Sequence, residues 1–427
     1  MRFGYVRSSP SDDRSCSPAL ATVEAGHEAY LIGGRPAEQP GPAHVPLAPA
    51  RADHQYLTAS LAYADRVYDT LRSLPLDVVV FPAGGAAFTT LRAKRLLGEF
   101  AGTRLVIEPH PGGPPAPSEP PASLDEMVGQ HLAEYCRRYG DGGTPAEPAA
   151  AEPALVSVLI PVRDQGEYLE AAVDSARRCG YQPLEIVVVD DGSTDPATLR
   201  ILDGLSSVRS RVVAGRSDGL TGVVVRRQPP RGLPAARNAA LEMARGEFVV
   251  PLDADDELPP GFVGPAVRAL HRDPGLGAVG GTVRNVGLLD HVSVPVGYVP
   301  DLSLVVNTFG RATAVLRSRA VRSAGGYDEG LPAYEDWDLY LRLHKAGWGV
   351  EYLPLTGQVY RRHADSMTFR QDERSRIALT QRLLRTHADL LTDRTGLLLT
   401  LVDFWKSGYE PSASVALRRE QALAPVP

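Results

Sequence analysis

This 427-residue chain has few cysteines, no excess of positive charge and no long apolar stretch. Its three cysteines, Cys16, Cys136 and Cys179, are far apart and lack metal-ligand spacing, which argues against a disulfide scaffold and is typical of a reducing compartment. A net charge of −6 gives no support for nucleic-acid binding, which a basic protein would favour. The first ten residues lack the apolar core of a signal peptide.

Apolar runs of membrane length are also absent from the sequence. The longest late apolar stretch, residues 396–404, is much shorter than the roughly 20 residues that a membrane helix needs. We therefore expect a cytoplasmic protein without a transmembrane segment, and peripheral attachment at a membrane surface stays open. The abundant alanine, arginine, glycine and proline suggest a bacterial source.

The length favours two domains, and the first is predicted over residues 1–110. Strands that alternate with helices indicate a parallel sheet covered on both faces, and hence a small Rossmann-like α/β domain. The predicted strands are residues 3–6, 28–32, 77–81 and 104–107, and the longer helices are residues 56–73 and 88–100.

A Pro/Gly-rich linker is predicted over residues 111–153. It contains one helix, which the capping-box spacing of residues 123–126 opens. After the linker, a clearer alternation of strand and helix patterns predicts a second α/β domain over residues 154–370. We expect its strands at residues 156–161, 184–189, 223–225 and 248–251, and helices at residues 167–178, 234–244 and 339–346.

The central feature of the second domain is a short apolar run, residues 248–252, that ends in Asp253, Asp255 and Asp256. Ligands of open α/β sheets collect beyond the carboxyl ends of strands, and clustered carboxylates repel one another unless a cation lies among them. Magnesium takes one or two protein carboxylates and leaves its other positions to water and phosphates. The run therefore predicts either a metal–diphosphate site or a solvated acidic loop before a helix.

Two further charged positions belong to the same domain. Asp190 and Asp191 end the predicted strand at residues 184–189, while Asp195 before Pro196 is typical of a helix N-cap. Arg237 lies in the first turn of a predicted helix, where a cation opposes the macrodipole. We expect an anion beside it, such as Asp190, Asp255 or a substrate phosphate; a solvated arginine is the alternative.

Six motifs follow one another in the second domain, at residues 158–164, 188–195, 236–240, 253–256, 325–329 and 334–339. In this order, they make residues 154–370 resemble a family 2 glycosyltransferase, a GT-A fold that binds nucleotide-diphosphate sugars. Residues 1–110 resemble, more weakly, the amino-terminal half of a GT-B glycosyltransferase through residues 25–33 and 77–81.

The resemblance implies roles for individual residues. Asp191, with Asp190 beside it, is similar to the position that reads the base of the donor nucleotide. Pro161 and Asp164 resemble the loop that borders the nucleoside, where the family commonly has asparagine in place of Asp164. Arg237 is expected to bind the substrate through its phosphate.

The remaining implied roles concern the cation and the reaction. Asp253 and Asp255 resemble the pair that holds the ribose and a divalent cation, Mg²⁺ or Mn²⁺, with Asp255 as the direct ligand. In Glu335-Asp336, the second acid resembles the catalytic base, and Glu335 is expected to bind the substrate. His363 lies where some relatives place a histidine on the metal or diphosphate, and a surface histidine is the alternative.

The resemblance thus implies a metal-dependent, inverting glycosyltransferase that uses a UDP- or dTDP-sugar. The alternative is a non-catalytic sugar-nucleotide-binding or scaffolding protein with the same fold. A glycan, a lipid-linked saccharide and a secondary metabolite all stay open as acceptor, and so does a homodimer.

A C-terminal helical extension is predicted over residues 371–427. Within it, Ile377, Leu379, Leu383 and Leu384 follow an imperfect helical period over residues 371–391, which suits a helix packed on the second domain. We also expect Trp337 to pack in the core and Asp338 to cap a helix.

Overall fold

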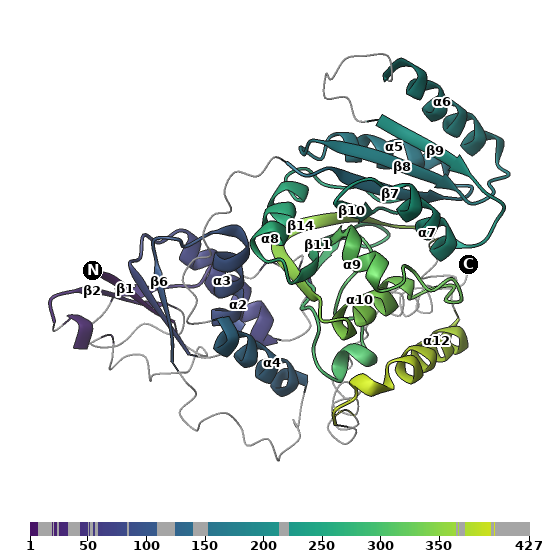
Figure 1. Ribbon diagram of the computed structural model, residues 1–427. Helices are drawn as coiled ribbons and strands as arrows, with labels where there is room; N and C mark the ends of the chain where they lie inside the picture. Colours follow the sequence, from purple (N-terminus) through teal and green to yellow (C-terminus); the bar gives the residue numbers. More distant parts are fainter. Residues whose placement is uncertain are drawn as a thin grey trace, which may run out of the picture. The chain divides into compact units, whose positions relative to one another are not determined.

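The computed structural model divides the chain into two compact units (Figure 1). Among the described residues, the first unit holds residues 1–139 with Asp393 and Leu397, and the second holds residues 153–392. The structure describes residues 1–6, 19, 21–23, 25–32, 43–49, 51, 54–55, 59–82, 85–108, 124–139, 153–212, 222–363, 366, 372–393 and 397.

The first unit contains a five-stranded parallel sheet in the order β3-β2-β1-β5-β6. Its α/β character agrees with the prediction, although the third strand was not predicted. Gly33, Gly34 and the capping residue Ser123 lie outside the described residues. The elements are β1 (Arg2–Val6), β2 (Glu28–Ile32), β3 (Ala43–Val45), β4 (His54–Gln55), α2 (Ala59–Arg72), β5 (Val78–Pro82), α3 (Gly85–Leu97), β6 (Arg104–Glu108) and α4 (Leu124–Tyr139).

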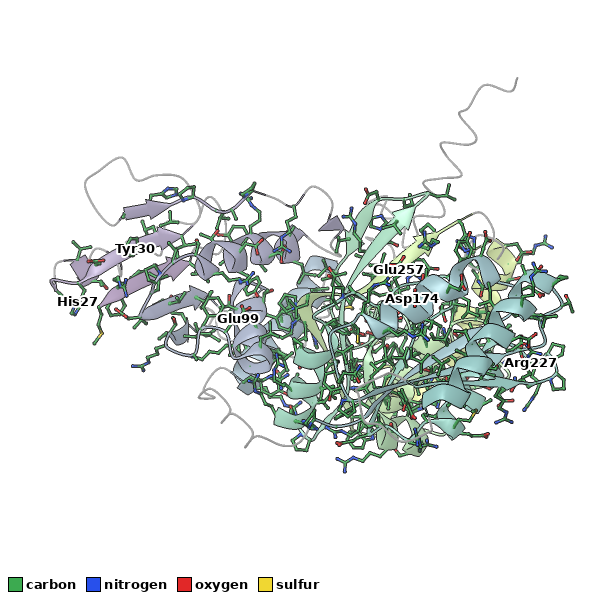
Figure 2. The ribbon with its side chains drawn as sticks, turned by 90° about the horizontal axis from the view of Figure 1, so that it is seen from above. His27, Tyr30, Glu99, Asp174, Arg227 and Glu257 are labelled. Atoms are coloured by element: carbon green, nitrogen blue, oxygen red, sulfur yellow. The ribbon has the colours of Figure 1, made fainter. Side chains whose placement is uncertain are left out.

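The core of the first unit follows from alternation along its strands. Val79 and Phe81 are buried, and so are Tyr68 of α2 and Phe88 of α3, as expected where amphipathic helices cover a sheet. Figure 2 shows His27 and Tyr30 at the end of the unit where its strands are seen, and Glu99 nearer its helices. The Tyr68 hydroxyl donates to Glu99 at 2.7 Å.

The second unit begins with alternating strands and helices whose positions agree with the prediction. Figure 1 shows α6 and α7 on opposite sides of strands β7, β8 and β9. These elements are β7 (Val156–Val162), α5 (Gly166–Arg177), β8 (Leu184–Asp190), α6 (Pro196–Val212), β9 (Gly222–Arg227), α7 (Leu233–Met243) and β10 (Phe248–Pro251).

Its remaining elements make the sheet mixed rather than parallel, because β13 runs antiparallel to β10 and β11, and β12 antiparallel to β11. The order is β12-β11-β13-β10-β7-β8-β9, and β14 pairs with β11 in parallel. The elements are α8 (Val263–Arg272), β11 (Leu276–Gly287), β12 (His291–Ser293), η1 (Leu302–Leu304), β13 (Val315–Arg317), α9 (Ser318–Ser323), α10 (Glu335–Lys345), β14 (Gly349–Arg362), α12 (Glu373–Thr386) and η2 (Ala388–Leu390).

Local signals set several helix starts. The N-cap prediction for Asp195 is confirmed, because its carboxylate accepts the backbone N–H of Thr198 at 2.8 Å and Pro196 is the first helical residue. The C-terminal helix begins at Glu373 and ends at Thr386. Its Leu383 is buried, as suits a helix packed on the second unit, whereas Ile377 is 51% exposed.

Leu383 and Ile377 of α12 give a matched test of how this helix is anchored. Leu383→Ala should lower the free energy of unfolding by about 2–5 kcal/mol, because it leaves a cavity in the core. Ile377→Ala should change it by about 0.5 kcal/mol or less, as is usual at exposed positions. Urea unfolding followed by the fluorescence of Trp337 and Trp348 measures both; equal losses would contradict the packing described.

Candidate active site

The carboxyl ends of three parallel strands of the second unit meet at one edge of its sheet. Val162 of β7 is in register with Asp190 of β8, and Leu159 of β7 with Pro251 of β10. The loops that follow these strands carry the predicted acidic residues. This edge is where open α/β sheets bind their ligands.

Asp191 holds the loop that leads into α7. Its carboxylate accepts the backbone N–H groups of Arg231 at 2.9 Å and Gly232 at 2.7 Å, and the side-chain amide of Gln228 at 2.8 Å. Gly232 has a φ of 97°, which only glycine adopts without strain. Asp191, which is predicted to read the base, therefore also fixes the start of α7, the helix that carries Arg237.

Asp164 and Asp190 fix the loop after β8. Asp164, with a φ of 52°, accepts the backbone N–H groups of Thr194 at 2.6 Å and Asp195 at 2.8 Å. Asp190 is 2% exposed and accepts the backbone N–H of Ser193 at 2.9 Å. Pro161 is buried in β7 beside this loop. The structure thus brings the four residues predicted to border the nucleoside to one strand-end loop region.

A buried arginine connects the strand end at Asp253 with the start of α10. Arg237 is 1% exposed; it donates to Asp253 at 2.5 Å and forms a second, very short ion pair with Glu335. The expectation that Asp190 or Asp255 pairs with it is wrong, and so is the solvated alternative. A buried guanidinium requires close carboxylates, and packing of α7 against α10 supplies Glu335 from a distant part of the sequence.

Burial and mutual repulsion raise the pKa values of the two acids at the start of α10. Burial raises the pKa of Glu335 to about 7, the charge of Asp336 adds to this rise, and Arg237 opposes it. Burial also raises the pKa of Asp336, against the opposing charge of Arg237. An acid with a raised pKa binds protons more strongly, so it is a better proton acceptor when ionised.

Asp336 lies in the first turn of α10 with a carboxylate that is only half-buried. One of its oxygens accepts the backbone N–H of Trp337 at 2.8 Å. Tyr334, just before the helix, has a φ of 64°, a left-handed conformation that is uncommon for a bulky residue. Non-glycine residues in this region are concentrated at functional sites.

The structure also places Asp255 beside His363, although they are 108 positions apart. The imidazole Nε2 lies 2.9 Å from the Asp255 carboxylate, and the ring of Tyr168 lies 5.3 Å from the imidazole ring. Burial and the charge of Asp253 raise the pKa of Asp255, against the hydrogen bond with His363. His363 is thus a partner of the acidic cluster, and the surface alternative is wrong.

These donors fit a divalent cation that keeps most of its positions for water and phosphate. Asp255 offers a carboxylate oxygen and His363 an imidazole nitrogen. Mn²⁺ accepts both kinds of ligand, whereas Mg²⁺ prefers oxygen. Among the described residues, no group of three or more His, Cys, Asp and Glu side chains is arranged to hold a metal ion. A cation here would therefore depend on the substrate for the rest of its coordination.

Asp256 belongs to the predicted acidic run, but the sequence predicted no role for it. It is 1% exposed and accepts the side-chain amide of Gln358 at 2.6 Å and the backbone N–H of Arg361 at 2.9 Å. These bonds hold the end of β14, and with it His363, against the acidic loop. The signal was available in the third acid of the run, but its partners lie too far along the chain to be recognised.

Two neighbours of Asp336 have structural roles. Trp337 is buried as predicted, and its indole N–H donates to the Ser303 carbonyl at 2.7 Å. The predicted capping role of Asp338 is wrong: its carboxylate contacts Arg342 at 2.7 Å and the buried His387 at 2.9 Å. Asp338 therefore joins α10 to the end of α12.

Comparison with known proteins identifies relatives for this unit. Residues 157–294 match the family described as Glycosyl transferase family 2, and residues 302–382 match the one described as Glycosyltransferase like family 2. Chondroitin synthase of Pasteurella multocida is 30% identical over 208 residues, which cover 45% of this chain and 19% of that protein. Pre-mycofactocin glycosyltransferase of Mycobacterium tuberculosis is 29% identical over 244 residues, which cover 49% and 43%.

The chain thus spans less than half the length of either relative. A crystal structure of S. aureus TarS is similar over 59% of this chain and 72% of the TarS chain, with 18% sequence identity and a TM-score of 0.43.

Within the described residues, none of the helices combines the length and apolar character needed to cross a membrane.

The buried ion pairs of Arg237 lead to a stability prediction. Arg237→Met should lower the free energy of unfolding of this unit by about 3–5 kcal/mol, because it leaves Asp253 and Glu335 without their cation. Arg226→Met is the matched control, since Arg226 also pairs with a glutamate, Glu242, but both side chains are exposed, by 43% and 70%. It should cost about 1 kcal/mol or less. Urea unfolding curves compare the two, and similar losses would contradict the role given to Arg237.

Proposed function

The two matched regions place this chain in glycosyltransferase family 2, as its motifs predicted, and we propose that it is an inverting, metal-dependent glycosyltransferase. It transfers a sugar from a UDP- or dTDP-sugar to an acceptor hydroxyl. Its second unit has the GT-A type of α/β fold that the sequence predicted. The observation that carries the proposal is the convergence of Asp191, the Asp253–Asp256 loop and Glu335-Asp336 on one region through Arg237 and its ion pairs.

In this proposal, the donor nucleotide lies over the strand-end loops. Asp190, Asp191, Asp164 and Pro161 border the nucleoside, and Asp253, whose side chain is 29% exposed, contacts the ribose. Asp255 and His363 would hold Mg²⁺ or Mn²⁺, which neutralises the charge of the leaving diphosphate when bound. Arg237 acts on the substrate indirectly, because its guanidinium is occupied by Asp253 and Glu335.

Asp336 is the proposed base. Its carboxylate accepts the proton of the acceptor hydroxyl while that oxygen forms a bond to the anomeric carbon and the bond to the diphosphate breaks. A single displacement of this kind inverts the anomeric centre. The raised pKa of Asp336 favours proton transfer, and the Glu335–Arg237 pair holds the start of α10 in place during the reaction.

Binding of the donor is tested by thermal shift with a panel of nucleotide sugars, with and without Mn²⁺. A ligand at 100 times its Kd should raise the melting temperature by about 5–10 °C, because it binds only the folded state. Asp255→Asn should lose the Mn²⁺-dependent part of the shift. Asp174→Asn, on α5 and labelled in Figure 2, is an exposed control that should keep it. A full Mn²⁺-dependent shift in Asp255→Asn would contradict the proposed ligand.

Catalysis is tested by Asp336→Asn. This change should lower kcat by about 10²–10⁴-fold, the usual contribution of a general base, while the affinity for the nucleoside diphosphate stays the same. Sugar transfer is measured by release of the nucleoside diphosphate, with Asp328→Asn as a control because Asp328 pairs with Arg382 in a largely exposed position. Near-normal transfer by Asp336→Asn would show that another group is the base.

A further inference from the structure

Arg311 is a partly buried cation that forms no ion pair within the described part of the protein. It lies between Gly310 and β13, and its guanidinium carbon is 4.8 Å from the ring centre of Tyr360. Among the described residues, its side chain forms neither a hydrogen bond nor an ion pair. By contrast, Arg237 pairs with Asp253 and Glu335, and Arg361 pairs with Glu257 at 2.9 Å.

A second guanidinium makes this position more positive. Arg362 also lies over the ring of Tyr360, at 4.6 Å, and donates to Asn285 at 3.2 Å. Two cations on one aromatic ring repel each other, and a partly buried environment screens this repulsion less than bulk water does. An anion that binds at Arg311 would remove this repulsion, so the arrangement is suited to an anionic ligand.

Arg311 is also tied to the helix that carries the proposed base. The Tyr340 hydroxyl of α10 donates to the Arg311 carbonyl at 3.0 Å. Burial raises the pKa of both Asp336 and Tyr334, and the charge of Arg311 opposes this rise. The guanidinium therefore lies within electrostatic reach of the group that would receive the acceptor's proton.

The alternation of side chains along β14 separates this cation from the proposed metal site. Tyr360 and Arg362 point to one face of the strand, whereas Arg361 and the following His363 point to the other. His363 contacts Asp255, on the side assigned to the diphosphate. A ligand of Arg311 would therefore lie on the other face of β14 from the proposed metal site.

We propose that Arg311 binds an anionic group, a carboxylate or a phosphate, carried by the glycosyl acceptor close to its attacking hydroxyl. This inference rests on the proposed glycosyltransferase function. It assigns Arg311 to acceptor specificity, since an acceptor with a neutral group there would leave the cation without a partner.

The test compares matched acceptor analogues by isothermal titration calorimetry, with UDP and Mn²⁺ present. The carboxylate probe is 4-nitrophenyl β-glucuronide, the phosphate probe is 4-nitrophenyl β-glucoside 6-phosphate, and 4-nitrophenyl β-glucoside is the neutral match for both. The wild type should bind at least one anionic probe about tenfold or more tightly than the neutral one, as expected for a charge-assisted hydrogen bond. Which probe is preferred identifies the acceptor's anionic group.

Arg311→Gln should bind all three probes equally, and Arg311→Lys should keep part of the preference because it keeps the charge. Arg319→Gln is the matched control and should keep the full preference, since Arg319 also lies over an aromatic ring, that of Trp348 at 5.3 Å, but is exposed. Circular dichroism and melting temperature verify that each variant is folded.

Three results would overturn the inference: no preference for an anionic probe in the wild type, a preference that survives in Arg311→Gln, or a matching loss of affinity for UDP in that variant. The last would place Arg311 on the donor diphosphate. The assay reads binding without turnover. A charge preference in a protein that transfers sugar from none of the donors would therefore support the anion site and count against the proposed enzyme alone.

Discussion

The second unit depends on a guanidinium that is removed from water. Arg237 is buried with Asp253 and Glu335 both in contact with it, and a buried cation requires such close and well-oriented partners. The pair connects the end of β10 with the start of α10, elements that are separated by more than 80 residues in the sequence. The positions of the acidic loop and of Asp336 relative to each other therefore follow from one buried charge.

Around this ion pair, the acids of the unit divide into those that hold the backbone and those that remain available. Asp191, Asp164 and Asp256 accept backbone N–H groups and fix the loops on which the site is built. Asp255 contacts His363, and Asp336 is half-buried; these are the acids to which the proposed function assigns a cation and a proton. Such rigid support is what a site that must position two substrates requires.

The sequence predicted the alternation of strands and helices in both halves, the family of the second unit and the first four strands of its sheet, β7 to β10. It did not predict β11, β12, β13 or β14. Glycines interrupt β11, and glycine and a proline interrupt β14; such residues weaken strand signals. The structure gives the reason: a Cβ on Gly281 would collide with the Leu355 carbonyl and the backbone of Gly357. The two strands approach too closely at this point for any side chain.

Local chemistry in the sequence determined which residue types end each strand and begin each helix, as Asp195 before Pro196 shows. Only the tertiary structure decided which charged residues meet. Arg237 pairs with Asp253 and Glu335 rather than with Asp190 or Asp255, Asp338 binds His387 instead of capping its helix, and Arg311 forms no ion pair among the described residues. The physical reason is that ion pairs between distant segments depend on how helices pack on the sheet, and a local pattern carries no information about that packing.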